Sequence, residues 1–225
     1  MHARNAWEAA RETERFALEQ YRAGRAAVDE ASRATEARLR AERDLAVCDL
    51  AADEMEITAR FADRRLDAPV VDGEDYVVRW LEIEEIYAER IRNNLTEQHA
   101  LADKRLKAGQ VKLIVVLPLD GEAAIARAEH KRWRELAALR RRMSANAIEG
   151  KRAYEQASAI IYSTDVEISR IRVRTANRVL KYIAAQHGAG LTDESKVLAA
   201  KSELLRLQNE QHEAEMGRGP GLPTR

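Results

Sequence analysis

Acidic residues on one predicted helix are the first candidates for chemistry. Glu82, Glu85 and Glu89 are spaced by three and four residues, so they share one face of a helix, with Glu84 adjacent. Carboxylates in that arrangement can hold a metal ion, but a di-iron site of the ferritin-like kind also needs a Glu-x-x-His motif. The residues three positions before the histidines that follow His2 are Thr96, Arg127, Ala184 and Asn209. The sequence therefore predicts no metal site.

Catalytic and nucleotide-binding motifs are missing from the sequence. Gly-x-Gly-x-x-Gly, Gly-x-Ser-x-Gly and His-Glu-x-x-His do not occur. The tripeptide Glu149-Gly150-Lys151 is like the end of a phosphate-binding loop, but it lacks the upstream glycine and strand. Cys48 is the sole cysteine, which excludes an internal disulfide and fits a reducing compartment. We expect no enzymatic activity and no cofactor.

A basic cluster is the candidate for nucleic-acid contact. Its arginines and lysine flank Trp133, and such a pattern can hold phosphates while the ring stacks on a base. Alternatively, Trp133, Leu136 and Leu139 form a buried stripe, and the arginines pair with acidic helices. We favour this second interpretation. The candidate phosphate contacts are Lys131, Arg132, Arg134, Arg140, Arg141 and Arg142.

Charge is divided unequally along a chain whose formal net charge is zero. Segments 1–67 and 68–120 each carry a net charge of −3, segment 121–187 carries +7, and segment 188–225 carries −1. We expect the arginines of the basic segment to pair mainly with carboxylates of the two acidic segments. Exposed pairs contribute only about 0–1 kcal/mol each, so they would set the register and the choice of partner more than the stability.

Glycine and proline are nearly absent from two long stretches. Between Arg4 and Asp67 the one glycine is Gly24 and there is no proline. Between Glu122 and His187 the one glycine is Gly150, again with no proline. Strong helix formers fill both stretches, and only 5% of the chain is aromatic. This composition predicts an all-α fold, an elongated helical bundle or coiled coil with two very long and two shorter helices. Helix should exceed about 70% of the chain on the same propensities.

The breakers divide the chain into five segments. We predict a long helix in 1–67; a linker, a second helix and a short apolar extended segment in 68–120; a long basic helix in 121–187; a fourth helix in 188–216; and a flexible tail in 217–225. Asp72 or Asp75 is the expected N-cap of the second helix, and Gly109 its C-terminal stop. Whether the long helices continue through Gly24 and Gly150 stays open.

One stretch breaks the helical pattern. Residues 111–117 are apolar except for Lys112, four of them are β-branched, and Pro118 follows; this pattern favours a short buried strand. Its expected partner is Val70-Val71 or a neighbouring copy of the chain.

Two apolar seams are expected to form a core or an oligomer interface. In the third helix, Tyr154, Ile161, Ile168 and Tyr182 recur at multiples of seven residues, with Ile171 interleaved, as in a coiled coil. In the second helix, Trp80, Ile83 and Tyr87 share one face.

Together these patterns favour a non-enzymatic structural or assembly protein. We expect a homo-oligomer that joins other subunits of a larger complex, for example a phage particle (a virion component) or a secretion or conjugation apparatus. The alternative is a nucleic-acid-binding or packaging accessory, and a third reading is an adaptor for a partner helix. The N-terminus lacks the apolar core of a secretory signal, and no apolar run reaches the roughly 20 residues of a membrane span. We therefore expect a location in the cytoplasm or within an assembled particle.

Overall fold

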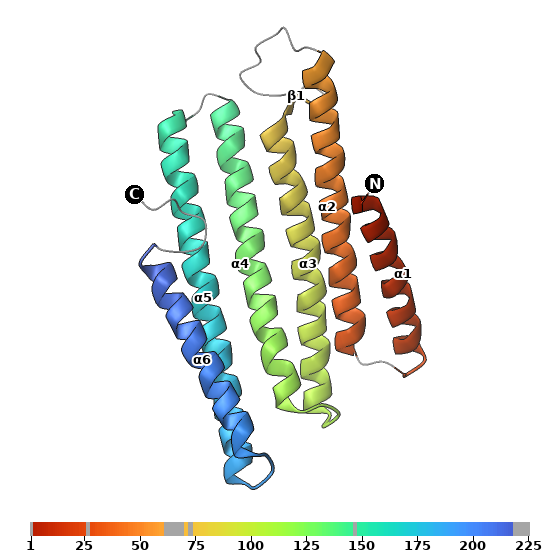
Figure 1. The fold of residues 1–225 in the computed structure, drawn as a ribbon, viewed down its shortest axis with the longest axis vertical. Helices are drawn as coiled ribbons and strands as arrows, with labels where there is room; N and C mark the ends of the chain where they lie inside the picture. The colour runs from red at the N-terminus through yellow and green to blue at the C-terminus, as the bar shows by residue number, and fades with distance from the viewer. Residues whose placement is uncertain (1, 26–27, 61–69, 72–73, 146–147, 218–225) are drawn as a thin grey trace. The chain divides into compact units, whose positions relative to one another are not determined.

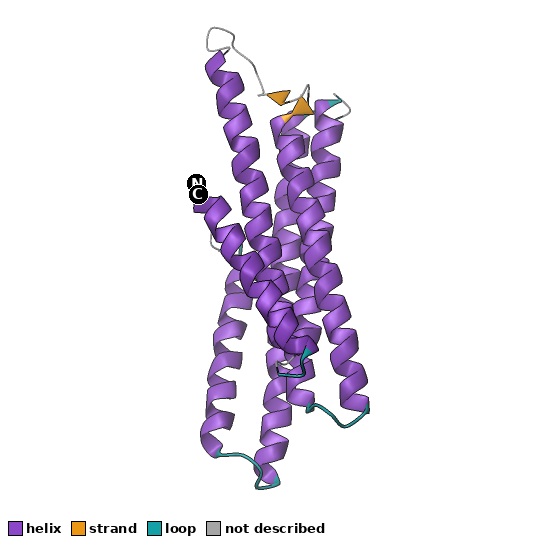
Figure 2. Cartoon of the chain, turned by 90° about the vertical axis from the view of Figure 1, so that its right-hand side faces the viewer, coloured by secondary structure: helices purple, strands orange, loops and turns teal. Residues whose placement is uncertain are grey.

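Six helices make up about 90% of the residues that the structure describes. The structure is a computed structural model, and it describes residues 2–25, 28–60, 70–71, 74–145 and 148–217 (Figures 1 and 2). The helices are α1 (His2–Arg22), α2 (Val28–Arg60), α3 (Tyr76–Lys107), α4 (Leu113–Ser144), α5 (Gly150–Gly188) and α6 (Glu194–Glu215). Strands β1 (Val70–Val71) and β2 (Glu74–Asp75) form one short antiparallel pair. The prediction of an all-α helical bundle is confirmed.

The chain forms two compact units that share three helices. The first unit comprises Met1–Asn94 and His130–Ala157, and the second comprises Leu95–Glu129 and Ser158–Arg225. Helices α3, α4 and α5 therefore each contribute one part to each unit.

In the first unit, consecutive helices lie side by side in the order of the chain (Figure 1). Side chains of α1 contact α2, those of α2 contact α3, and those of α3 contact the C-terminal part of α4. The buried apolar residues on these helices include Ala31, Leu39, Leu50, Leu81 and Ala137. Each inner helix thus buries two narrow stripes, one toward each neighbour.

The second unit is built around the junction of α3 and α4 and around α5. Ala102 of α3 packs with Val116 and Leu119 of α4 in a buried cluster. Gly121 of α4 lies so close to α5 that a Cβ there would stand 2.5 Å from Oγ1 of Thr175. The glycine permits this close helix approach.

Helix α6 packs on α5 in the same unit. The Tyr162 hydroxyl donates to the backbone carbonyl of Glu215, at 2.7 Å, and Arg170 pairs with the Glu215 carboxylate. Val197 and Leu207 of α6 are buried.

Alanine supplies much of the described core. Eight of the 21 buried apolar residues are alanines, and no large side chain is completely buried in the described part of the chain. Alanine lets helices approach closely but removes little apolar area from water, and the hydrophobic free energy scales with that area. These alanine positions therefore contribute little hydrophobic free energy to either unit.

The predicted first long helix is divided at Gly24. This glycine has φ of +69°, a left-handed conformation that ends α1, and the Arg25 N–H donates to the Gln20 carbonyl at 2.8 Å. Such a bond is the usual closure of a helix that ends at a glycine. The part of the prediction that covers 61–67 lies outside the described residues.

The predicted long helix over 121–187 is also divided, because α4 ends at Ser144 and α5 begins at Gly150. Nothing lies within 4 Å of a Cβ built on Gly150, so this glycine marks a helix start rather than a close helix crossing.

The extended segment predicted over 111–117 is wrong, because α4 begins at Leu113. A short apolar run can be a strand or a buried helical turn, and periodicity alone does not separate them. Here the helical turn places Val116 and Leu119 on one side, against Ala102. Pro118 lies in the second turn, where it removes one backbone hydrogen bond and its ring crowds the carbonyl four residues earlier. Val70-Val71 pairs with Glu74-Asp75 instead.

The ends of the two shorter helices agree with the sequence. Asp75 caps α3, since its Oδ1 accepts from the Val77 N–H at 2.8 Å. Gly109, with φ of +69°, follows the end of α3, as predicted. Gly190, with φ of +70°, follows the end of α5. The predicted tail lies outside the described residues, except for Gly217. In the described part of the chain, no helix is long and apolar enough to cross a membrane.

The close approach of α4 and α5 gives a first prediction. Gly121→Ala should lower the free energy of unfolding by about 1–3 kcal/mol, because the new methyl group overlaps Thr175. Urea unfolding followed by circular dichroism measures the change, and a second substitution, Thr175→Ala, should recover most of the loss. Gly188→Ala is the matched control, since nothing lies near that glycine. Equal stability of Gly121→Ala and wild type would contradict the close contact.

Candidate functional site

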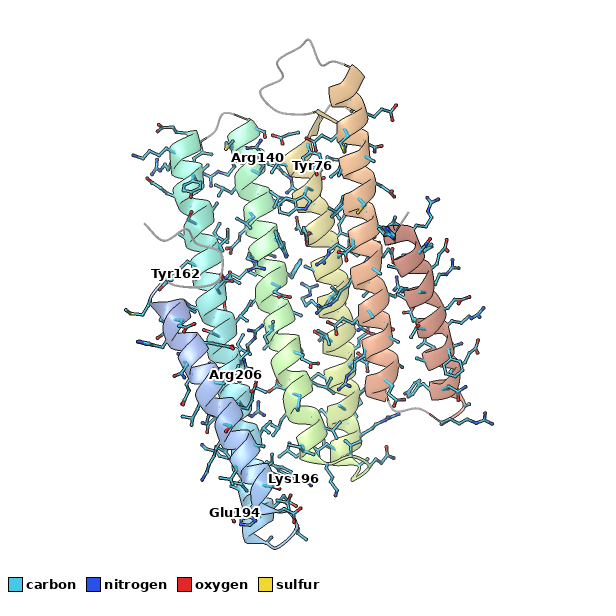
Figure 3. All side chains as sticks on the ribbon, viewed as in Figure 1. Tyr76, Arg140, Tyr162, Glu194, Lys196 and Arg206 are labelled. Carbon is cyan, nitrogen blue, oxygen red and sulfur yellow. The ribbon has the colours of Figure 1, made fainter. Side chains whose placement is uncertain are left out.

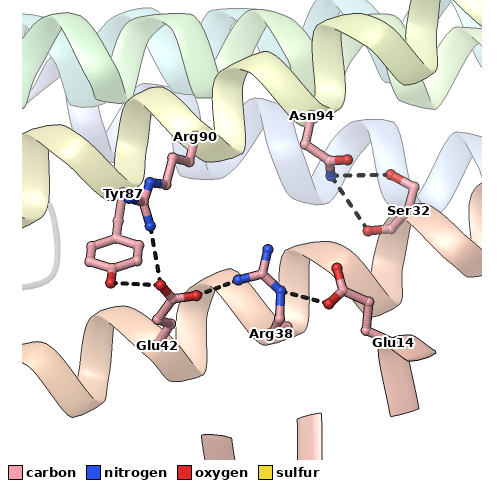
Figure 4. Close-up of polar contacts among 7 residues, drawn as sticks. All are labelled: Glu14, Ser32, Arg38, Glu42, Tyr87, Arg90 and Asn94. Carbon is pink, nitrogen blue, oxygen red and sulfur yellow. Dashed lines mark hydrogen bonds and ion pairs between the residues drawn. The ribbon is translucent and has the colours of Figure 1, made fainter. Parts of the chain in front are cut away.

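A chain of polar contacts links α1, α2 and α3 (Figure 4). Glu14 of α1 lies 2.7 Å from Nε of Arg38 on α2, and Arg38 also pairs with Glu42 one turn away. Glu42 Oε1 accepts from the Tyr87 hydroxyl at 3.2 Å and from Arg90 at 3.1 Å, both on α3. Burial and the neighbouring Glu42 raise the pKa of Tyr87, so the phenol stays protonated and donates. These contacts fix how the three helices are rotated against one another.

A second polar junction joins the start of α3 to the end of α4. Asp75 Oδ2 accepts from Arg140 at 2.6 Å and from the Ser144 hydroxyl at 3.0 Å, while Oδ1 caps α3 (Figure 3 labels Arg140). Burial alone would raise the pKa of Asp75. The hydrogen bonds from Arg140, Ser144 and the Val77 N–H, with the charge of Arg140, outweigh burial and hold the pKa below its usual value.

Two buried titratable groups lie farther along the same helices. Burial raises the pKa of Glu84, and Arg43, 3.8 Å away, only partly offsets it. Burial and the charge of Arg92 lower the pKa of His130, whose Nδ1 lies 2.9 Å from Nη1 of Arg92. Both groups are closed in by packed helices, so we interpret them as structural.

Of the six candidate phosphate contacts, Arg140 and Arg141 are held in ion pairs with acidic side chains before and on α3. Arg140 pairs with Asp75, and Arg141 lies 2.9 Å from Glu82 and 3.8 Å from Glu85. These pairs agree with the interpretation that arginines of the basic segment meet acidic partners within the chain.

The other four candidates fall into two groups. Arg132 is half-buried, and its guanidinium carbon lies 5.1 Å from the ring centroid of Trp133. Lys131, Arg134 and Arg142 are exposed on α4. The structure thus leaves three of the six free to meet solvent.

The predicted seam on α5 divides into an exposed and a buried part. Tyr154 is 74% exposed and Ile161 is also exposed, whereas Ile168 is buried and Ile171 and Tyr182 are half-buried. The C-terminal part of the seam therefore belongs to the core of the second unit. Its role as an oligomer interface stays a prediction.

The predicted face of α3 belongs to the interior of the first unit. Trp80 packs edge-on against Trp133, with the ring centroids 5.6 Å apart and the planes at 83°. Ile83 is half-buried and Tyr87 is buried.

A leucine ladder begins in the turn between α5 and α6 and continues along α6. We give this name to Leu191, Leu198 and Leu205, which are spaced by seven residues and are 71%, 55% and 61% exposed. The sequence interpretation did not include them, although their spacing is visible. What the spacing alone does not reveal is that α6 turns Val197 and Leu207 toward its own unit and the leucines outward.

A groove of about 500 Å³ lies among α4, α5 and α6 in the second unit. Ile125, Val179 and Leu207 contribute apolar surface to it. At its rim, Arg206 of α6 (Figure 3) is paired with Glu203 and Glu210 of its own helix. These three charged side chains therefore form ion pairs with one another within α6.

No described group of three or more histidine, cysteine, aspartate or glutamate side chains is arranged to hold a metal ion. Of the acidic candidates on α3, Glu82 and Glu85 lie near Arg141, and Glu89 pairs with Arg92 at 3.0 Å.

Compared with protein-family models, with curated proteins and with solved structures, the chain finds no match. Function is therefore inferred from its own residues.

The junction at Asp75 gives a second prediction. Asp75→Ala should cost about 1–3 kcal/mol of unfolding free energy, because it removes a helix cap and leaves Arg140 without this partner. The folded-state pKa is lowered, so the contribution is present above the unfolded pKa near 3.8 and is lost as the pH falls below it. Thermal unfolding from pH 7 to pH 2.5 checks both effects. Asp103→Ala, which removes an exposed pair within α3, should change little; an equal loss in both variants would contradict the junction.

Buried Glu84 gives a third prediction, of opposite sign. Glu84→Gln should raise the melting temperature at pH 7, because burial disfavours the ionised carboxylate and the amide avoids that charge. The folded-state pKa is raised, so wild type gains stability as the pH falls toward 4.5, and the difference should then vanish. Differential scanning calorimetry at several pH values follows this convergence. The control Glu85→Gln should show no gain, and a lower melting temperature for Glu84→Gln at pH 7 would refute the prediction.

Proposed function

We propose that this chain is a non-enzymatic structural or assembly protein that self-associates as a subunit of a larger complex. One observation carries the proposal: eight of the 21 buried apolar residues in the described part of the chain are small alanines, while large apolar side chains lie outside at heptad spacing. The exposed set includes Leu191, Leu198 and Leu205 near and on α6, and Tyr154 and Ile161 on α5.

An exposed apolar side chain is ordinary when it stands alone. Seven-residue spacing is different, because it aligns the side chains in a stripe along one helix face and such a stripe is what a second helix covers. Exposed apolar stripes of this kind commonly mark interaction sites. Association would supply the burial that the small alanine side chains do not.

Larger assemblies of this type include phage particles and secretion or conjugation machines, and the chain would work there with copies of itself and other subunits. We propose the cytoplasm or an assembled particle as its location by analogy with other helical proteins.

Nucleic-acid binding is the weaker alternative. Two of its six candidate residues are in ion pairs with Asp75 and Glu82, and a third lies against Trp133. A polyanion would have to compete with carboxylates that are already in place.

Mass measurement tests the proposal. Light scattering of the purified chain from about 1 to 100 μM should show a mass that rises above 25.4 kDa with concentration. Cytochrome c at the same concentrations and in the same buffer controls for non-specific attraction. A monomer at every concentration would contradict self-association.

A titration with duplex DNA at two salt concentrations tests the alternative, nucleic-acid binding. Micromolar binding that falls steeply with salt, and that is lost in Lys131→Glu with Arg142→Glu, would support nucleic-acid contact. Both residues are exposed, so the double variant should keep wild-type helicity.

A further inference from the structure

A groove of about 380 Å³, lined by four apolar and four charged side chains, lies between α2 and α3 in the first unit. Its apolar side chains come from both helices: Ala46, Leu50, Ile83 and Ile86. Leu50 is buried, whereas Ile86 is 48% exposed. The groove thus has a packed floor at one point and an uncovered apolar wall at another.

The α2 side of the groove is acidic. Asp49 and Asp53 lie one turn apart and are exposed, and within the described part of the chain neither makes an ion pair. Glu82 on the opposite side is paired with Arg141. Arg79 of α3 also lines the groove, so the lining holds three carboxylates and one guanidinium. A partner placed in the groove would therefore find an excess of negative charge, with Asp49 and Asp53 along α2.

The leucine ladder has the matching length. Leu198 and Leu205 are seven residues apart, or about 10.5 Å at 1.5 Å per residue. The first and last groove residues are also seven residues apart on each helix, 46 and 53 on α2 and 79 and 86 on α3. Two ladder leucines therefore fit within one length of the groove.

The ladder also has the matching charge. Lys201 lies between Leu198 and Leu205 and is exposed, and helical spacing places it at the edge of the ladder. In the described residues it has no ion pair.

We infer that α6 of one copy docks in the α2–α3 groove of a second copy. Leu198 and Leu205 cover the apolar floor, and Lys201 faces Asp49 and Asp53. This contact rests on the proposed self-association and names its two surfaces. Because the surfaces differ, the contact is head-to-tail and can be repeated from copy to copy.

Pairing of two ladders with each other fits the charges less well. In a parallel pair, residues flanking the seam meet five positions apart, which sets Lys201 against Arg206 of the second copy. Two ladders can also pair antiparallel, with Leu198 of one copy opposite Ser202 of the other. In that arrangement, Lys201 of one copy lies beside Lys201 of the other. The acidic groove offers Lys201 opposite charge instead.

Two variants that each keep one surface test the contact. The ladder variant is Leu198→Asp with Leu205→Asp, and the groove variant is Ile86→Lys with Asp49→Lys. All four positions are exposed, so circular dichroism should show unchanged helicity. Alone, each variant should need at least tenfold higher concentration than wild type to associate. Mixed in equal amounts, the two variants should form dimers that do not grow further, because only one intact ladder and one intact groove remain.

A charge exchange adds a second measurement. Lys201→Glu should weaken association at least tenfold, and adding Asp49→Lys with Asp53→Lys in the same chain should restore it. The matched control is Phe16→Asp, which changes a side chain that is 62% exposed on α1 and belongs to neither surface.

The outcomes separate this contact from the proposed function. Undiminished association of both variants would overturn the docking and leave self-association standing. Two monomeric variants that fail to pair when mixed would overturn it in favour of contacts between like surfaces. A wild-type monomer at all concentrations would overturn both.

Discussion

The narrowness of the apolar stripes is the constraint on which the rest of this structure depends. An inner helix of the first unit has a neighbour on each of two sides, so it must divide its apolar residues between two contacts. Small residues such as Ala31 and Ala137 allow those contacts to be close. They also limit the hydrophobic free energy, which is about 25 cal/mol for each Å² of apolar surface removed from water.

Polar contacts supply the specificity that such stripes lack. Alanine surfaces can slide past one another with little change in packing, whereas Glu42 can meet Tyr87 and Arg90 at only one register. Half-buried pairs of this kind contribute modestly to stability because desolvation offsets much of the attraction. Glu84 shows the limit of the arrangement, since its burial raises its pKa despite the nearby Arg43.

Local signals in the sequence predict helix ends better than they predict contacts between helices. Asp75 and Gly109 act on their own neighbouring backbone; Gly109 was predicted as a helix stop, and Asp75 was one of the two predicted N-caps. The prediction for 111–117 was wrong because a short apolar run suits a strand and a buried helical turn alike, and the contact of Val116 with Ala102 lies outside the run. Gly24 was noticed, but only its left-handed backbone shows that the helix ends there.

The candidate surfaces were predicted less well, for a related reason. Spacing of seven residues finds a stripe but does not say whether the chain itself covers it. On α5, Ile168 is buried while Tyr154 is exposed; on α6, Leu207 is buried while Leu198 and Leu205 are exposed. Only the packing of each helix on its neighbours separates core from surface.

Helix α1 differs from the other helices in how little of it is buried, and this affects how it moves. None of its residues is buried, and Trp7 and Tyr21 are only half-buried on its inner side. Local opening is cheapest where few apolar contacts are lost. Amide protons of α1 should therefore exchange with solvent through partial unfolding, in which α1 detaches while α2 and α3 stay folded. Such openings would transiently uncover the side of α2 that carries Arg38, the partner of Glu14, a latent surface that exists only in a minor population of molecules.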